Sequence, residues 1–186
     1  MLARVFYHNL QDIVSMVLLA VRMARGFDPD NLAPYLTELH PLECLSLGRC
    51  YEALNWGDAS LAAYESAVDR LTASEAQVQA WRDLGYAYKR LERRAEAVAL
   101  WETWVGTVAG DDLTPYVELA KHHEWHSRDL AAARGWAAWA LRIAEGWPAS
   151  YLRDEAVGEL RHRLARIEAK LNGRTTDDER QIAAEE

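Results

Sequence analysis

The histidine-rich segment His122-His123-Glu124-Trp125-His126 contains the residue types that most directly suggest chemistry. His122 and His126 are four residues apart, so on a helix they would share one face, as pairs of zinc ligands do. The order is not His-Glu-x-x-His, however, because Glu124 follows the second histidine, and no third ligand stands nearby. We therefore do not predict zinc here. The sequence also lacks a Ser-His-Asp order, a phosphate-binding glycine loop and a Cys-x-x-Cys motif.

A repeat organises the middle of the chain. Gly48, Gly85 and Ala120 are spaced 37 and 35 residues apart. Sixteen residues after each of them stands an aromatic residue: Tyr64, Trp101 and Trp136. The middle copy, Trp81-x-x-Leu84-Gly85-x-x-Tyr88, resembles the tetratricopeptide helix pair. Such pairs stack into a solenoid with a concave binding surface, so the repeat predicts an all-α, tetratricopeptide-like solenoid.

Helix start and stop signals divide the chain into four parts. We expect an N-terminal orphan helix at 1–25, a linker at 26–40, a repeat domain at 41–173 and a disordered acidic tail at 174–186. Within the repeat domain we predict three helix pairs and a C-terminal capping helix. The predicted pairs are 41–54 with 58–71, 75–91 with 94–108, and a third whose helices begin at Thr114 and Asp129; the capping helix follows at 150–171.

The bulk composition suits a cytoplasmic protein with no membrane partner. A net charge of −8 disfavours sequence-independent binding of nucleic acid. Cys44 and Cys50 are six residues apart, so on a helix they point in different directions and should stay unpaired, as in a reducing compartment. The most apolar segment, 13–24, is shorter than the ~20 residues that span a bilayer.

The repeat also predicts a binding groove, because the first helix of each tetratricopeptide pair lines the concave surface. The five basic residues expected there are Arg49, Arg82, Lys89, Arg90 and Lys121. Glu52 and Glu124 are the acidic residues expected there, and Tyr86 and Trp125 offer stacking surfaces. This excess of positive charge favours a protein or peptide with an acidic segment, or a phosphate backbone. An ordinary solvated helix face is the alternative.

Two tryptophans occupy positions where a tetratricopeptide usually has alanine. Trp104 and Trp139 come three residues after the repeat aromatics Trp101 and Trp136, at a position where neighbouring helices approach closely. A large aromatic side chain there must be met by small partners, which the nearby alanines can supply. We expect both tryptophans in the structural core, with a ligand pocket as the alternative.

Two segments resemble one enzyme family. They are Val5-Phe-Tyr-His8-Asn-Leu-Gln-Asp12-Ile-Val-Ser-Met and Leu119-Ala120-Lys121-His-His-Glu124-Trp125-His126. Both resemble the YprB-like branch of the ribonuclease-H-like (DEDD-type) 3′–5′ exonucleases, which has a tetratricopeptide-like helical tail. In that superfamily the aspartate of the first motif binds a catalytic divalent metal, Mg or Mn, and the neighbouring Tyr or His orients the attacking water. By this resemblance Asp12 would be a metal ligand and His8 its water-orienting neighbour.

The chain departs from this family at the rest of the catalytic site. The superfamily needs an Asp-x-Glu on an early strand and a further Asp on a middle helix, and neither can precede residue 4. One aspartate cannot hold two metal ions ~3.5–4 Å apart. We therefore expect this chain to correspond to the C-terminal third of such a protein, without nuclease activity or a cofactor of its own.

Three functions follow from these observations. The preferred one is a tetratricopeptide-like protein-binding module derived from an exonuclease family protein. In the second, Asp12 and His8 complete an active nuclease with a separately encoded or missing N-terminal domain, which would also bring nucleic acid as a partner. In the third, the chain is a plain tetratricopeptide adaptor and the N-terminal resemblance is accidental.

Overall fold

The computed structural model describes the backbone of residues 2–28, 31–72, 75–108 and 110–185, and the side chains from residue 6 to residue 173 within these ranges. All regular secondary structure in this described part is helical. The chain divides into two compact units, Met1–Leu91 and Glu92–Glu186, which we call the N-terminal and C-terminal units.

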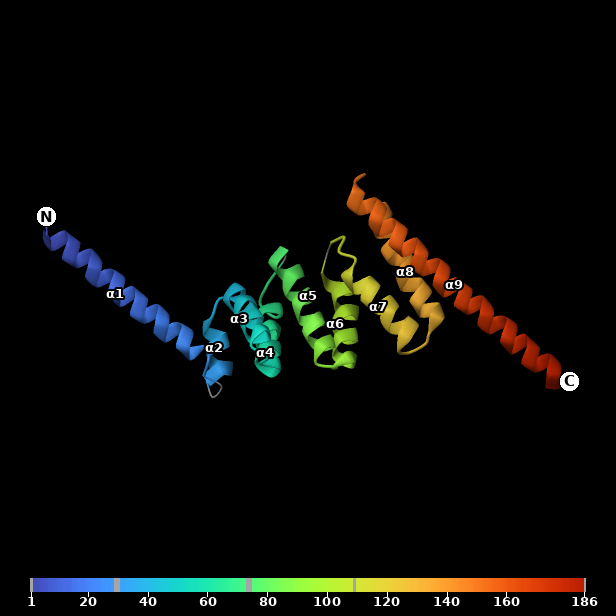
Figure 1. The fold of residues 1–186 in the computed structure, drawn as a ribbon, viewed down its shortest axis with the longest axis horizontal. Helices are drawn as coiled ribbons and strands as arrows, with labels where there is room; N and C mark the ends of the chain where they lie inside the picture. The colour runs from blue at the N-terminus through green and yellow to red at the C-terminus, as the bar shows by residue number, and fades with distance from the viewer. Residues whose placement is uncertain (1, 29–30, 73–74, 109, 186) are drawn as a thin grey trace. The chain divides into compact units, whose positions relative to one another are not determined.

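The N-terminal unit contains the first predicted helix pair. Its helices are α1 (Leu2–Arg25), α2 (Leu32–Glu38), α3 (Pro41–Ala53), α4 (Gly57–Val68) and α5 (Glu75–Arg90). Helix α3 packs against α4, and α4 also packs against α5 (Figure 1). A capping box starts α3: the His40 ring accepts a hydrogen bond from the Leu42 backbone N–H, and the Glu43 carboxylate accepts one from the His40 backbone N–H.

The C-terminal unit contains the third predicted pair and the capping helix. Its helices are α6 (Arg94–Thr107), α7 (Thr114–Trp125), α8 (Leu130–Glu145) and α9 (Tyr151–Glu185). Helix α8 packs against both α7 and α9 (Figure 1). Asp129 caps α8 by accepting the Ala132 backbone N–H at 2.9 Å, as the start signal at this residue predicts.

The repeat is also visible in the backbone. Asn55, Glu92 and Arg128 have φ angles of 59°, 58° and 56°, in the left-handed region. Each lies two residues before the second helix of a predicted pair, at α4, α6 and α8 respectively. A left-handed residue therefore precedes the second helix of each pair. The sequence does not reveal this feature, because glycine is the usual residue in this conformation and none of the three is glycine.

Small residues allow the helices to approach closely, as the template predicts. A Cβ atom added to Gly48 of α3 would lie 2.5 Å from Cε1 of the fully buried Tyr64 on α4. In the C-terminal unit Ala120 of α7 and Ile167 of α9 join one buried cluster with three residues of α8: Leu130, Ala133 and Ala137. This cluster therefore consists of alanine side chains and two larger aliphatic ones, Leu130 and Ile167.

The predicted linker contains the short helix α2, with Pro34 in its first turn, where a missing N–H is tolerated. Two sequence expectations are corrected. Helix α9 continues to Glu185 and does not end at Leu171, because Gly173 remains helical and does not take a left-handed conformation. Trp104 is buried as expected, but Trp139 is 52% exposed and stacks against Arg142 at 3.9 Å. The side chains of residues 174–186 lie outside the described part, and disorder of this segment stays a prediction.

Helix α1 has few contacts with the rest of its unit. Its apolar side chains from Phe6 to Met23 are exposed on all sides. Near its C-terminal end, Arg22 pairs with Glu43 at 2.9 Å, and the Tyr35 hydroxyl donates a hydrogen bond to the Arg22 carbonyl. None of the described helices combines the length and the apolar character needed to cross a membrane.

Candidate functional site

The strongest concentration of charge in the C-terminal unit lies where α9 crosses α7. Glu124, near the end of α7, has a fully buried side chain. Arg166 donates two hydrogen bonds to its carboxylate, from Nε to Oε1 at 2.9 Å and from Nη2 to Oε2 at 2.8 Å. Lys170 Nζ donates to Oε1 at 2.7 Å, and Arg163 Nη1 donates to Oε2 at 3.3 Å. We call Glu124, Arg163, Arg166 and Lys170 the α7–α9 cluster.

The cations decide the charge state of this carboxylate. Burial opposes ionisation of Glu124, but the hydrogen bonds and charges of Arg166 and Lys170 outweigh it and lower its pKa to about 2. The hydrogen bond to Glu124 in turn raises the pKa of Arg166. Glu124 is therefore an anion at neutral pH. Three cations surround one carboxylate, which leaves the cluster with a net charge of +2.

A tryptophan lies directly beside the cluster. Trp125 follows Glu124 on α7, and 56% of its surface is exposed. Lys170 Nζ lies 3.8 Å from the centroid of its ring, and the Arg166 guanidinium carbon lies 5.6 Å from it. Cation–π attraction of this kind holds both the ring and the cations in place. The site thus combines an apolar surface with oriented positive charge.

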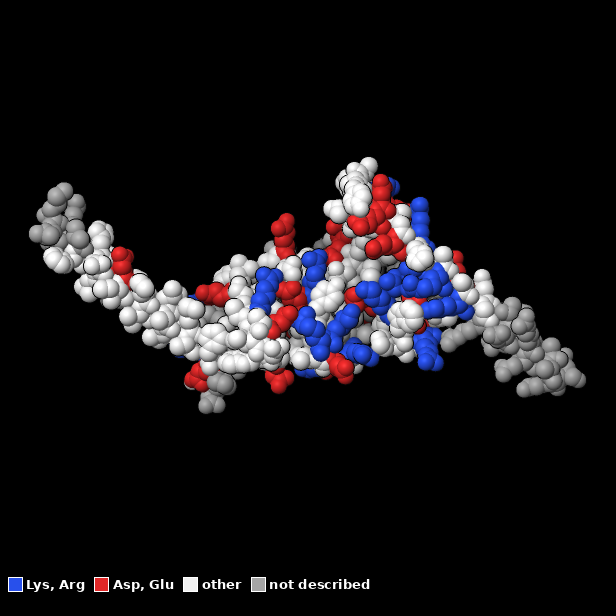
Figure 2. All heavy atoms as spheres, in the orientation of Figure 1, with Lys and Arg blue, Asp and Glu red and all other residues white. Residues whose placement is uncertain are grey.

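Sequence reasoning missed this cluster. It placed Glu124 in the concave groove and assigned the last helix only the role of a capping helix. Arg163, Arg166 and Lys170 are three and four residues apart, so they share one helix face, and that spacing was the available signal. Their partner is 39 to 46 residues earlier in the chain, which local patterns do not connect. Figure 2 shows Lys and Arg side chains gathered over this part of the C-terminal unit.

The predicted groove residues of the N-terminal unit are partly neutralised by acids. Arg49 donates from Nε to Asp83 at 2.8 Å, and Arg90 Nη2 lies 2.6 Å from Glu52. Asp83 was not among the residues expected in the groove. Arg82 and Lys89 both lie on α5, and Lys89 Nζ lies 5.6 Å from the centroid of the Tyr86 ring. A groove ligand would therefore compete with existing ion pairs at Arg49 and Arg90.

The predicted groove residues Lys121, Glu124 and Trp125 belong to the C-terminal unit. Lys121 Nζ lies 2.7 Å from the carboxylate of Glu118, whose side chain is only 3% exposed. This ion pair holds Lys121 against its own helix. Trp125 lies beside the α7–α9 cluster, in contact with Arg166 and Lys170. The groove itself stays a prediction.

The residues singled out for metal chemistry are not gathered into a site. His8 and Asp12 are exposed side chains on α1, and the ring of His8 contacts Tyr7 with centroids 6.1 Å apart. The His122 and His126 rings lie 5.7 Å apart. Burial and the neighbouring imidazoles lower the pKa of His122. Within the described residues, no group of three or more His, Cys, Asp or Glu side chains is arranged to hold a metal ion.

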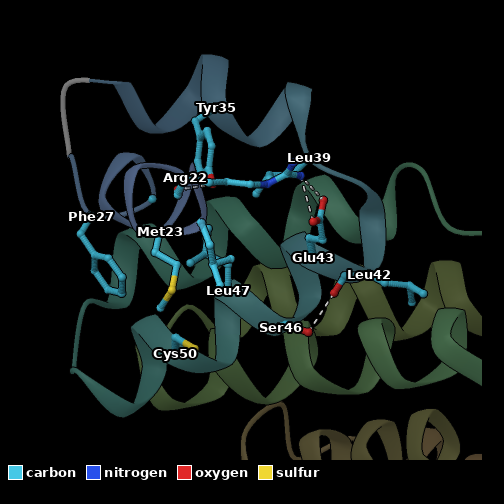
Figure 3. Close-up of a pocket in the computed structure, with 12 residues that line it drawn as sticks. Arg22, Met23, Phe27, Tyr35, Leu39, Leu42, Glu43, Ser46, Leu47 and Cys50 are labelled. Atoms are coloured by element: carbon cyan, nitrogen blue, oxygen red, sulfur yellow. Dashed lines mark hydrogen bonds and ion pairs between the residues drawn. The ribbon is translucent and has the colours of Figure 1, made fainter. Parts of the chain in front are cut away.

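An apolar pocket of about 410 Å³ lies at the junction of α1, α2 and α3 in the N-terminal unit. Met23 of α1 points toward Leu47 and Cys50 of α3 there, and Arg22 extends toward Glu43 (Figure 3). Its polar feature is the Arg22–Glu43 ion pair. The lining offers apolar contact surface without a set of groups suited to acid–base or nucleophilic chemistry.

The comparisons with known proteins agree with the fold. No family model matches the chain. The chain is 26% identical over 173 residues to an uncharacterized protein, YprB, of Bacillus subtilis (strain 168), a match that covers 91% of this chain and 39% of that relative. The chain thus spans well under half the length of YprB, which is compatible with a C-terminal part of such a protein.

A solved structure shows a similar helical arrangement. The crystal structure of PcrH from Pseudomonas aeruginosa superposes with a TM-score of 0.54 over 68% of this chain and 90% of PcrH, at 12% sequence identity. Together with the helix pairs, this likeness confirms the predicted all-α, tetratricopeptide-like fold.

Proposed function

We propose that this chain is a tetratricopeptide-like protein-binding module that takes an acidic segment of a partner protein and is not catalytic by itself. The observation that carries the proposal is the concentration of Arg and Lys on the α7–α9 cluster of a chain whose net charge is −8. Opposite charge on a partner increases the association rate and restricts which partners bind. The helical-repeat fold supplies an extended surface of the kind used for protein recognition.

A protein partner is favoured over nucleic acid by the charge balance of the chain. Non-specific binding of a phosphate backbone depends on many cations that release counterions. Here 29 acidic residues outnumber 21 basic ones, and several of the basic residues form internal ion pairs. A small cationic surface within an acidic protein is better suited to one short acidic segment.

The proposal is tested by measuring the binding of fluorescent peptides to the purified chain by anisotropy. We expect a short Asp/Glu-rich peptide to bind, a Lys/Arg-rich peptide not to bind, and added salt to weaken the complex. The double variant Arg82→Glu, Lys89→Glu then tests the predicted groove of the N-terminal unit. A matched control reverses two exposed cations outside it, Arg134→Glu and Arg161→Glu. Equal binding of all peptide types would contradict the proposed function.

A second candidate function is a part of a metal-dependent 3′–5′ exonuclease completed by an N-terminal domain. It is favoured by the length of YprB, of which this chain covers 39%, and by the His8 and Asp12 side chains, which lie exposed one helical turn apart on α1. In this function Asp12 would bind Mg or Mn once further carboxylates are supplied, and His8 would orient water.

The second candidate is tested with the isolated chain and single-stranded DNA or RNA in the presence of Mg²⁺ or Mn²⁺. We expect no hydrolysis, because one aspartate cannot hold two metal ions. Hydrolysis that disappears in Asp12→Ala but persists in Asp28→Ala, a carboxylate outside α1, would show that the chain is catalytic by itself.

A further inference from the structure

The α7–α9 cluster has hydrogen-bond donors that Glu124 does not use. A guanidinium carries five N–H groups and an ammonium three. Arg166 binds Glu124 through Nε and Nη2, and its Nη1 has no partner among the described residues. Within the described part of the chain, Arg163 bonds through Nη1 alone, at 3.3 Å, the longest distance in the cluster. The remaining donors are available to a second anion.

Glu124 fixes these cations in position before any ligand arrives. Its carboxylate is fully buried, and the three cations that converge on it are 19%, 37% and 34% exposed at Arg163, Arg166 and Lys170. Long basic side chains normally lose conformational entropy when a ligand orders them, and that loss weakens binding. Because Glu124 has already ordered them, an incoming carboxylate meets a rigid site with a net charge of +2.

Trp125 adds an apolar contact next to the charge. Half of the indole surface is exposed even though Lys170 lies over one part of the ring. Tryptophan and arginine are the residue types that most often dominate the energetics of protein interfaces. A ligand that combines a carboxylate with a neighbouring apolar side chain would use both features at once.

The geometry points to a carboxylate-binding site on α7 and α9, in which Arg163, Arg166 and Lys170 bind an Asp or Glu side chain of a partner peptide while Trp125 packs against an adjacent apolar residue of that peptide. This inference rests on the proposed function and names the site that performs it. The site lies wholly within the C-terminal unit, whereas the groove cations Arg49, Arg82, Lys89 and Arg90 belong to the N-terminal unit.

An acidic peptide fits this site better than a single-stranded nucleic acid does. A phosphate backbone presents a run of negative charges, whereas the cluster has a net charge of only +2. One or two carboxylates match that charge.

The test uses the full chain and a fluorescent peptide in which one leucine is flanked by Asp and Glu residues. We expect Arg163→Gln and Lys170→Gln each to weaken binding about threefold to tenfold, and Trp125→Ala to weaken it by a similar factor. Replacing the peptide leucine with serine should weaken binding to the wild-type chain but not to Trp125→Ala. Circular dichroism confirms that each variant is folded.

Matched controls come from the same unit. Arg161→Gln removes a cation of α9 that pairs with Glu145 and does not touch Glu124, and Trp139→Ala removes a similarly exposed tryptophan that stacks on Arg142. Both should bind the peptide as the wild type does.

Three results would overturn the inference. If the folded cluster variants bind as the wild type does while Arg82→Glu, Lys89→Glu abolishes binding, the site is wrong and the proposed function stands. If no acidic peptide binds at all, both the carboxylate-binding site and the proposed function are wrong. Tighter binding of a single-stranded oligonucleotide than of the peptide, lost in Lys170→Gln, would assign the site to nucleic acid instead.

Discussion

Arg166 of α9 holds the buried carboxylate of Glu124 of α7 with two parallel hydrogen bonds, although the two residues are 42 positions apart in the chain. Paired hydrogen bonds between a guanidinium and a carboxylate are among the strongest and most directional polar contacts in proteins. Helix α8 connects the two helices in sequence and packs against both. The ion pair therefore fixes the capping helix α9 to α7 directly.

This ion pair predicts a specific pH dependence of stability. The pKa of Glu124 is lowered from its ordinary value of 4.5 to about 2 in the folded chain. A lowered folded-state pKa stabilises the fold above pH 4.5, and that contribution is lost as the pH falls toward 2. We expect Glu124→Gln to lower the free energy of unfolding by about 1–3 kcal/mol at neutral pH. Its unfolding free energy should also change less than that of the wild type between these pH values.

The measurement is urea denaturation followed by circular dichroism at a series of pH values. Glu168→Gln, which removes an exposed carboxylate of α9, is the control and should retain the wild-type pH dependence. Parallel pH profiles for the wild type and Glu124→Gln would show that the cluster does not stabilise the fold.

A second prediction concerns the close contact between α3 and α4. In Gly48→Ala the new methyl group would lie 2.5 Å from Cε1 and 2.6 Å from Cδ1 of Tyr64. The ring cannot move away easily, because it is fully buried and its hydroxyl donates a hydrogen bond to Glu52 at 2.8 Å. We expect a loss of about 1–3 kcal/mol in the free energy of unfolding, measured by thermal or urea denaturation.

Gly135→Ala is the matched control for that substitution. Gly135 is also a helical glycine, in α8, but a Cβ there would meet nothing within 4 Å. Alanine should stabilise this helix by about 0.5–1 kcal/mol, because it restricts the unfolded chain. Equal effects of the two substitutions would mean that the Gly48–Tyr64 contact is not the reason for the glycine.

The helix pairs could be predicted from the sequence because their determinants are local. Small residues at Gly48 and Ala120 recur with aromatic residues sixteen positions later, and that spacing follows from the length of one helix pair. Start signals such as Asp129 gave the starts of the repeat helices to within a residue or two. The end of α9 was missed, because glycine stops a helix only where it adopts a left-handed conformation, which the sequence does not specify at Gly173.

The candidate site could not be predicted, because its residues come from separate helices. The position of Glu124 in the tetratricopeptide repeat assigns it to the groove, but the direction of its side chain depends on where α9 packs. The buried carboxylate and its cations Arg163, Arg166 and Lys170 become recognisable as one cluster only when the two helices are in contact. The spacing of basic residues within α9 indicates the three cations, and only the tertiary structure shows that Glu124 lies among them.

The two tryptophans at equivalent repeat positions give a third prediction. Trp104 is 2% exposed, whereas Trp139 is 52% exposed. We expect Trp104→Ala to cost about 3–5 kcal/mol of unfolding free energy, because it leaves a large cavity. Trp139→Ala should cost about 1 kcal/mol or less, since it removes mainly the contact with Arg142. Thermal denaturation of the two variants side by side checks this difference, and similar losses would place Trp139 in a core as well.

The last prediction concerns α1. Its exposed apolar side chains include Phe6, Leu10, Ile13, Met16, Val17, Leu18 and Leu19. Exposed apolar surface of this extent promotes association, so we expect the full chain to self-associate in a concentration-dependent way. Deleting residues 1–25 should leave a monomeric, helical chain. The deletion removes the Arg22–Glu43 and Arg25–Glu38 ion pairs, which are exposed and contribute about 0–1 kcal/mol each.

Sedimentation velocity and thermal denaturation of the two chains test this prediction. The double variant Leu10→Gln, Val17→Gln separates the two effects, because it removes two apolar side chains from one face of α1 and keeps the helix contacts near Arg22. It should reduce self-association without changing the melting temperature. If deletion of 1–25 instead unfolds the helices from α3 onward, then α1 is an integral part of the N-terminal unit, held by contacts such as the hydrogen bond from Tyr35 to the Arg22 carbonyl.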